Sequence, residues 1–106
     1  MTDEIIVLIT TANKNDAEAI SFALVNEHLA ACVNIIPAIR SLFFWEGKVQ
    51  DEQEILLVIK SRLHLLDHLI ARVKDLHSYT VPEILALPII GGSPEYLSWL
   101  RTSTRE

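Results

Sequence analysis

Two side chains of the kinds that bind transition metals stand out in this sequence, Cys32 and His77. Thiolate and imidazole are ligands that suit copper and zinc. A metal site normally draws on several ligands with a recognisable spacing, and no CxxC pair or HxxxH pair with a carboxylate brackets these two residues. A single cysteine between alanine and valine is also commonly a small buried hydrophobic side chain. Cys32 and His77 therefore form a metal-site hypothesis beside a simpler structural one.

A second group of residues mixes charged, polar and aromatic side chains that have no obvious role in a core: Trp45, Lys60, Tyr79 and Glu83. A cleft lined by such groups can bind a small anion or metabolite, with Lys60 as the charge partner and His77 and Tyr79 as hydrogen-bond donors. The equal alternative is an ion pair between Lys60 and Glu83, with an aromatic ring packed at a subunit boundary. The residue types alone do not choose between the two.

Hydrophobic periodicity predicts the elements that would position these side chains. Branched apolar runs predict strands over 5–9, 31–45, 48–60 and 84–87. Apolar residues at helical spacing predict helices from residue 14 to about 28, from 62 to about 77, and over a short C-terminal segment from 94. The order strand, helix, strand, strand, helix, strand predicts an α+β, ferredoxin-like βαββαβ domain.

Single residues predict where these elements begin and turn. Asn13, Ser61 and Ser93 are each suited to cap the helix that follows. Pro37 predicts a bulge or bend in the second strand. Gly47 predicts a tight reversal made of a type I turn and a G1 bulge.

The predicted hairpin between the second and third strands is long for a domain of this size. Two strands of about 13 residues would span about 40 Å, roughly twice the usual strand length. Its tip carries Leu42, Phe43, Phe44 and Trp45, which a monomer would expose. Either the strands bend back over the sheet at Pro37 or a second subunit covers the tip, and we favour the second subunit.

Composition narrows the classes of function. The 106 residues predict one domain, 1–106, with a globular balance of 50% hydrophobic and 22% charged residues. The net charge of -5 disfavours binding to nucleic acid or to anionic lipid. The acidic segment 1–4 lacks the features of a secretory signal, and a single cysteine suits a reducing compartment, so we expect a cytoplasmic protein.

Several segments resemble the signature segments of CutA divalent-cation tolerance proteins, and the resemblance extends over essentially the whole chain. These are Ala30-Ala31-Cys32-Val33-Asn34-Ile35-Ile36-Pro37, Trp45-Glu46-Gly47-Lys48-Val49, Glu54 with Ile59-Lys60, Tyr79-Thr80-Val81-Pro82-Glu83-Ile84, and Tyr96-Leu97-Ser98-Trp99. The resemblance implies a homotrimer in which long hairpins pair between subunits, similar in architecture to the PII signalling proteins, with clefts at the subunit boundaries. It also implies tolerance of copper and other divalent cations without a catalysed reaction.

The sequence departs from the copper-binding pattern of that family. Copper-binding relatives carry a cysteine at the end of the first strand and two consecutive histidines before the tyrosine. These positions here are Ile9, Leu76 and His77, so one of three ligands remains. This departure argues against a copper site of that kind, while Cys32 and His77 remain the candidates for a copper(II) or other divalent-cation site.

Two functions and one exclusion follow. The first is a trimeric cytoplasmic binding protein that supports divalent-cation tolerance. The alternative is a PII-like sensor that binds a small metabolite in a cleft between subunits. We expect no enzyme activity, because the segment after the first strand, Thr10-Thr11-Ala12-Asn13, lacks the glycine and arginine of a phosphate-binding loop, and no nucleophile has an adjacent base.

Overall fold

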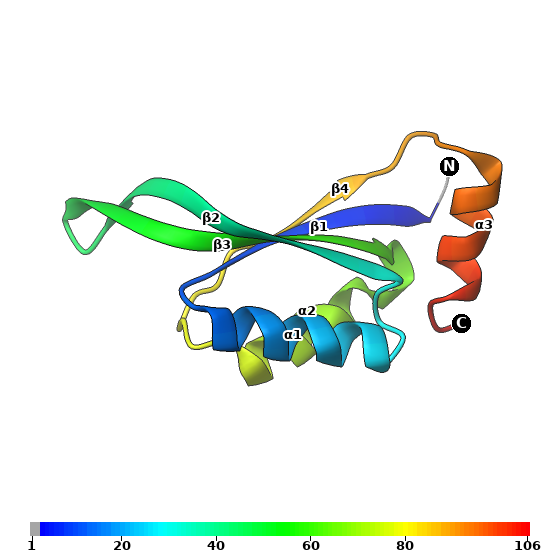
Figure 1. Cartoon of the computed structure of the whole chain (residues 1–106), viewed down its shortest axis with the longest axis horizontal. Helices are drawn as coiled ribbons and strands as arrows, with labels where there is room; N and C mark the ends of the chain where they lie inside the picture. The colour runs from blue at the N-terminus through cyan, green and yellow to red at the C-terminus, as the bar shows by residue number, and fades with distance from the viewer. Residues whose placement is uncertain (1–2) are drawn as a thin grey trace.

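The structure, a computed structural model, describes residues 3–106; the first two residues of the acidic N-terminal segment lie outside them. The chain is α+β, with a four-stranded antiparallel sheet and three α-helices (Figure 1). The elements in chain order are β1 (Glu4–Thr11), α1 (Lys14–Asn26), β2 (Cys32–Trp45), β3 (Lys48–Arg62), η1 (Leu63–Leu65), α2 (Leu66–Leu76), β4 (Ile84–Pro88) and α3 (Pro94–Thr102). The predicted order of strands and helices is confirmed.

The strands lie in the order β2-β3-β1-β4, so that β1 and β3 are central. β1 pairs with β3 from Glu4 opposite Arg62 to Thr11 opposite Ile55, and with β4 from Ile5 opposite Pro88. β4 is short and lies at an edge of the sheet, where a proline costs no ladder hydrogen bond on its free side.

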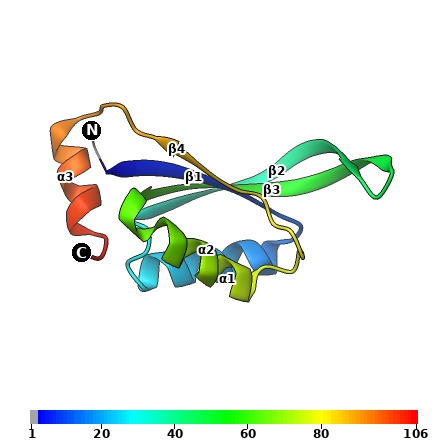
Figure 2. The same cartoon turned by 180° about the vertical axis from the view of Figure 1, so that it is seen from behind.

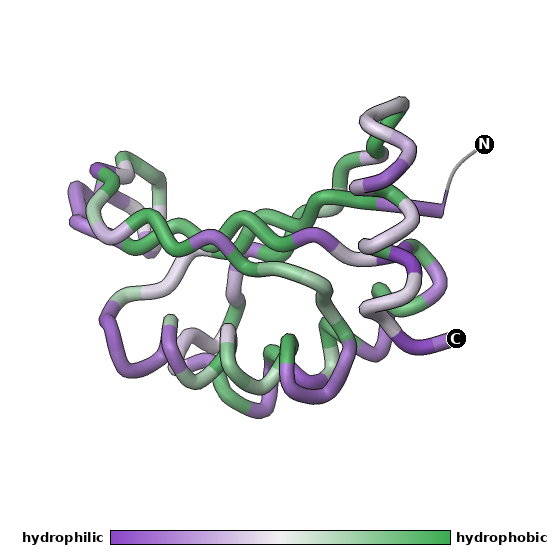
Figure 3. Tube along the Cα trace, turned by 45° about the vertical axis from the view of Figure 1, so that its right-hand side comes forward, coloured by the Kyte–Doolittle hydropathy of each residue, from purple (hydrophilic) through white to green (hydrophobic). Residues whose placement is uncertain are grey.

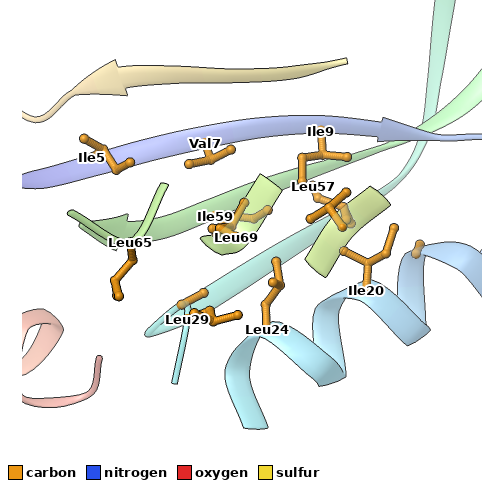
Figure 4. Packing of buried hydrophobic residues seen from close by; sticks show 13 residues of the cluster. Ile5, Val7, Ile9, Ile20, Leu24, Leu29, Leu57, Ile59, Leu65 and Leu69 are labelled. Atoms are coloured by element: carbon orange, nitrogen blue, oxygen red, sulfur yellow. The ribbon is translucent and has the colours of Figure 1, made fainter. Parts of the chain in front are cut away.

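Helices α1 and α2 cover one face of the sheet and build the core there (Figures 1 and 2). Alternate residues of the central strands point toward the helices, as the two-residue period of a strand requires. The fully buried cluster contains Val7 and Ile9 of β1, Leu57 and Ile59 of β3, Ile20 and Leu24 of α1, and Leu69 and Val73 of α2 (Figure 4). At about 1.5 to 3 kcal/mol for each large apolar side chain, this layer holds the sheet against the helices.

Two of the three predicted helix caps are confirmed. The Asn13 side chain accepts a 2.8 Å hydrogen bond from the backbone N–H of Asp16, and Ser93 precedes Pro94 at the start of α3. The third prediction is wrong. Ser61 is the penultimate residue of β3, and its buried hydroxyl donates to the Leu29 carbonyl at 2.6 Å, while the chain enters α2 through the short 3-10 turn η1.

The hairpin β2–β3 extends well beyond the helices rather than folding back over the sheet, and the chain measures 44 Å along its longest axis (Figures 1 and 2). Trp45 pairs with Lys48 across a two-residue loop in which both Glu46 (φ 51°) and Gly47 (φ 81°) have positive φ. Positive φ at both central positions is the mark of a type I′ turn, so the predicted type I turn with a G1 bulge is wrong. The turn's own twist matches that of the two strands.

The predicted irregularity at Pro37 is confirmed as a shift in the pairing of β2 with β3. Ile36 pairs with Leu56 and Ile39 with Glu54, so β2 has one residue more than β3 between these two pairs. Alternation along β2 therefore reverses at this point. The residues of β2 that follow the bulge and face the same side as Glu54 are odd-numbered, beginning with Ile39 opposite Glu54 and Ser41 opposite Glu52.

Helices α1 and α2 leave one face of the sheet uncovered (Figure 2), and the strands are hydrophobic along much of their length (Figure 3). We call this uncovered face the open face; its apolar residues are Ile6 and Leu8 of β1, Leu56 and Val58 of β3, Ile36 of β2, and Leu85 and Leu87 of β4, and Cys32, Asn34 and Lys60 lie on it toward the α3 end. Leu85 is 56% exposed and Leu87 46% exposed. An apolar surface of this extent on one side of a sheet is unusual for a chain that works alone.

Helix α3 closes one end of the sheet. Its Leu100 is fully buried, and its Arg101 donates a 3.2 Å hydrogen bond to the buried carboxylate of Glu4. The rings of Tyr96 and Trp99 contact each other in a tilted arrangement, with 5.4 Å between their centroids and 48° between their planes. In residues 3–106 no helix is long and apolar enough to cross a membrane.

Candidate binding groove

A groove of about 1280 Å³ lies between the outer half of the hairpin and the segment that joins α2 to β4. Its walls come from four parts of the chain: Thr10 and Ala12 at the end of β1, Ser41, Phe43 and Trp45 of β2, Gln50, Glu52 and Glu54 of β3, and Tyr79 to Glu83. The bulge in β2 puts Ser41, Phe43 and Trp45 on the same side as the β3 glutamates, because residues directly opposite in a ladder share a face. We call this cavity the groove.

The closest contact across the base of the groove joins Tyr79 to Glu54. The Tyr79 hydroxyl donates a 2.8 Å hydrogen bond to Glu54 Oε2, and the Glu54 side chain is only 5% exposed. Burial, the hydrogen bond to Glu54 and the negative charges of Glu54, Glu52 and Asp16 raise the pKa of Tyr79 far above its usual range. The Tyr79 hydroxyl therefore keeps its proton and acts as a donor.

His77 fixes the segment that carries Tyr79. Its Nε2 donates to the Thr10 carbonyl at 2.7 Å, and its Nδ1 accepts from the backbone N–H of Tyr79 at 3.0 Å. The ring is 8% exposed and lies 4.8 Å from the Tyr79 ring. Both ring nitrogens of His77 are thus engaged with backbone groups, and the contact orients Tyr79 toward Glu54.

Carboxylates outnumber cations along the groove. Glu46, Glu52, Glu54 and Glu83 line it with Arg40 and Lys48. Arg40 is engaged by Asp51, which it binds through two hydrogen bonds of 2.9 and 2.7 Å. Among residues 3–106, no cationic side chain forms an ion pair with Glu52, Glu54 or Glu83.

Of the predicted ligand-binding residues, the structure brings Trp45, Tyr79 and Glu83 together along the groove and places Lys60 elsewhere. Lys60 pairs with Ile6 and Cys32 in the sheet, and its ammonium group hydrogen-bonds to Asn34 Oδ1. The lysine therefore projects from the open face, toward the α3 end. Within one chain it supplies no positive charge to the groove.

Cys32 and His77, the predicted metal ligands, lie at opposite ends of the sheet. Cys32 is level with Ile6, whereas His77 contacts Thr10, four residues and about 13 Å farther along β1. Cys32 lies beside Tyr96, whose pKa is raised by burial and by the neighbouring Cys32 thiol. In the described part of the chain, no three histidine, cysteine or carboxylate side chains are grouped so that they could hold a metal ion.

Sequence reasoning assigned neither Glu52 nor Glu54 to the site, although Glu54 is one of the residues that resemble the CutA signature segments. The available signal was the alternation of glutamates in a strand that is otherwise apolar toward its end: Glu52 and Glu54 share a face with Leu56 and Val58. A carboxylate on that face needs a polar environment, and the groove provides it.

Nearly all of the chain matches one family of proteins. The family model described as CutA1 divalent ion tolerance protein matches residues 5–103. The chain belongs to the CutA1 divalent ion tolerance family. The membership predicted from the signature segments is therefore confirmed.

The similarity to individual CutA proteins extends over nearly all of this chain. It is 52% identical over 101 residues to the divalent-cation tolerance protein CutA of Thermus thermophilus, covering 95% of this chain and 98% of that one. It is 52% identical over 102 residues to the chloroplastic protein CutA 1 of Oryza sativa, of which it spans 58%, and 96% of this chain is covered. The crystal structure of CutA1 from Oryza sativa superposes with a TM-score of 0.95 at 50% identity, over 99% of this chain and 96% of that one.

The names of CutA relatives differ in cellular compartment. The rice protein is called chloroplastic, whereas a solved structure from Archaeoglobus fulgidus is called a periplasmic divalent cation tolerance protein. The latter is 38% identical, with a TM-score of 0.91 over 94% of this chain and 97% of that one. CutA proteins are therefore not tied by name to one compartment, and the cytoplasm stays a prediction for this chain.

Proposed function

We propose that this CutA1 chain is a ferredoxin-like subunit of a cytoplasmic, non-catalytic homotrimer that supports divalent-cation tolerance by binding copper(II) or another divalent cation where subunits meet. The observation that carries the proposal is the pair of uncovered apolar surfaces, the open face and the hairpin tip. Phe44 at the tip is 71% exposed and Leu85 on the open face 56% exposed. Covering them with other copies of the chain removes both surfaces from water.

An intersubunit site also accounts for the separation of Cys32 and His77. Cys32 lies on the open face and His77 next to the groove, so ligands from neighbouring copies can complete a coordination set that one chain does not provide. A metal at His77 would take Nδ1 in place of the Tyr79 N–H, while the Nε2–H group keeps its hydrogen bond to the Thr10 carbonyl. The names of the relatives concern divalent cations, and for this reason we rank the PII-like metabolite sensor second.

Light scattering on the full chain tests the assembly. We expect a solution mass of three chains, which Phe44→Asp lowers because a buried carboxylate at a subunit contact is costly. Phe22→Asp is the matched control, since Phe22 on α1 is 74% exposed and lies on neither surface. A native mass of one chain contradicts the proposal, and so does an unchanged mass in Phe44→Asp.

Calorimetric titration with Cu(II), Zn(II) and Ni(II) tests the metal. We expect binding that Cys32→Ser and His77→Ala each weaken at least tenfold, a loss of about 1.4 kcal/mol or more. His68→Ala, at an exposed position of α2, is the control and should leave binding unchanged. An intact trimer that binds none of the three metals contradicts this part of the proposal. Hydrolysis of an acyl phosphate by the purified protein contradicts the non-catalytic assignment.

A further inference from the structure

The imidazole of His64, in the turn η1, lies between segments from the two ends of the described chain. Its Nδ1 is 2.8 Å from Asp3 Oδ2, and its Nε2 is 3.2 Å from the backbone carbonyl oxygen of Arg105. We call residues 103–106, which follow α3, the strap. The His64 side chain is 37% exposed, so it can exchange protons with water. His64 therefore joins the strap to the segment before β1 through a group that titrates.

Both atoms that face the His64 ring accept hydrogen bonds and have no proton to donate. A backbone carbonyl is only an acceptor. Burial raises the pKa of Asp3, but the hydrogen bonds and charges of His64 and Arg62 outweigh it and hold this pKa below its usual range, so the carboxylate is ionised at neutral pH. A neutral imidazole has one N–H group and an imidazolium has two. Both contacts of His64 can therefore form together only when the ring is protonated.

The other contacts of the strap need no charged histidine. Arg105 donates from its backbone N–H to the His28 carbonyl at 2.9 Å and from Nε to the Glu27 carbonyl at 2.8 Å. The Ser103 carbonyl accepts from His28 Nδ1 at 3.3 Å, and a neutral imidazole can supply that proton. These bonds seat the strap on the C-terminal end of α1, where carbonyl groups lack partners within the helix. Loss of the His64 proton therefore removes one contact of the strap and leaves the rest.

Other charged groups lie on the elements around His64. Carboxylates and guanidinium groups ordinarily keep their charge over the range in which histidine titrates. His28 can gain a proton without losing its bond to the strap, and His68 on α2 has no hydrogen bond to the strap within the described chain. His64 is thus the group whose proton the strap contact requires. The remaining charged side chains of these elements are Asp3, Glu27, Arg62, Asp67, Arg72, Arg105 and Glu106.

We propose that protonation of His64 controls the docking of the strap, which the imidazolium holds at acidic pH and the neutral ring releases as the pH rises. When the proton leaves to water, the remaining N–H stays on Nδ1, because its bond to the Asp3 carboxylate is charge-assisted and is the stronger of the two. Nε2 then turns a lone pair toward the Arg105 carbonyl oxygen, and that contact becomes repulsive. With one contact fewer, the strap separates more often from the end of α1. The inference needs neither the trimer nor the metal site.

Amide exchange measured by NMR on the full-length native protein tests the proposal. The readout is the backbone N–H of Arg105, which is bonded to the His28 carbonyl, and the amides of β3 are the internal reference. Protection is expressed relative to the intrinsic exchange rate at each pH. We expect protection of the Arg105 amide to fall about threefold to tenfold between about pH 5 and about pH 8, since a hydrogen bond to a charged group is lost at a partly exposed site. Protection in β3 should stay unchanged.

Three variants assign the effect to His64. His64→Gln has no titrating group, so the Arg105 amide should be equally protected at both ends of the pH range. Asp3→Asn removes the carboxylate that favours the imidazolium, so the fall should come at lower pH. His68→Gln, at an exposed position of α2, is the matched control and should repeat the wild-type profile. In the wild type, the imidazole signals of His64 should change with the same midpoint as the Arg105 amide.

Four results overturn the proposal. They are equal protection of the Arg105 amide at about pH 5 and about pH 8 in the wild type, a fall of the wild-type size in His64→Gln, an Asp3→Asn profile identical to that of the wild type, and a parallel fall in the amides of β3. The last would mean that the whole fold loosens with pH instead of the strap alone. The Asp3 variant keeps the test decisive if His64→Gln does not fold.

Discussion

The Tyr79 hydroxyl and the Glu54 carboxylate, 25 positions apart in sequence, meet at 2.8 Å and tie the segment after α2 to the base of the hairpin. His77 holds the Tyr79 backbone from the other side by accepting its N–H. Tyr79 and His77 together thereby connect the hairpin at Glu54 to the end of β1 at Thr10.

Removing that hydroxyl should destabilise the fold. Tyr79→Phe leaves a buried carboxylate without its donor, and we expect a loss of about 2 kcal/mol in the free energy of unfolding, because hydrogen bonds to charged groups are stronger than neutral ones. Urea unfolding at a fixed protein concentration measures it. Tyr96→Phe, whose hydroxyl faces the Cys32 thiol, should cost less than about 1 kcal/mol. Equal losses in the two variants would argue against a special role for the Tyr79 contact.

The same phenol predicts a fall in stability at alkaline pH. Its folded-state pKa is raised above the unfolded value of 10.0, so its contribution is complete below pH 10.0 and is lost as the pH rises toward the folded pKa. One such proton corresponds to about 1.4 kcal/mol per pH unit. Urea midpoints measured across this range should fall less steeply in Tyr79→Phe than in the wild type. The Tyr79→Phe variant should still lose some stability with rising pH, because the pKa of Tyr96 is also raised. Equal slopes of urea midpoint against pH in the variant and the wild type would contradict the role given to Tyr79.

A single substitution in α1 should stabilise the protein. Ser21 is 7% exposed, and its Oγ has no hydrogen-bond partner within residues 3–106. Ser21→Ala removes an unsatisfied buried hydroxyl and improves helix propensity, so we expect a gain of about 1 kcal/mol. Thermal unfolding checks it against Ser98→Ala, at an exposed position of α3, where propensity alone gives about 0.5 kcal/mol or less. A loss of stability in Ser21→Ala would mean that the hydroxyl is satisfied in solution.

The contact between α3 and β1 should be sensitive to loss of its cation. Glu4 is 2% exposed and Arg101 is its ion-pair partner, so Arg101→Ala leaves a buried charge unpaired and should cost about 3 kcal/mol. Adding Glu4→Gln should recover most of that loss, which chemical denaturation can measure. Lys14→Ala breaks the exposed pair with Glu18 and should cost less than about 0.5 kcal/mol. A double variant as unstable as Arg101→Ala would contradict this explanation.

Local sequence signals predicted the elements of the fold well. Three signals that depend only on neighbouring residues are confirmed in the structure. They are the branched apolar runs of the strands, the helix cap at Asn13 and the start of α3 at Ser93-Pro94. Ser61 misled because a serine before a helix and a serine at the end of a buried strand look alike; its hydroxyl is used by Leu29, far away in sequence.

The candidate site was harder to predict because it depends on register. Trp45, Tyr79 and Glu83 meet, while Lys60 does not join them, because its place in the ladder beside Ile6 puts it near α3. No periodicity in the sequence fixes that register. Cys32 and His77 are separated for the same reason.

The bulge in β2 also determines how the hairpin tolerates changes in length. One residue of 37–38 is surplus to the pairing, since Ile36 and Ile39 pair with residues only two apart in β3. Deleting Ala38 would leave every later pair of the ladder in place and would change only the bend of the hairpin. A deletion at Gln53 would instead give β2 two residues more than β3. The turn would then hold a pairing register different from the one that the buried halves of the strands need. The two strands of one hairpin should therefore accumulate insertions and deletions unequally over evolutionary time, with β2 the permissive strand.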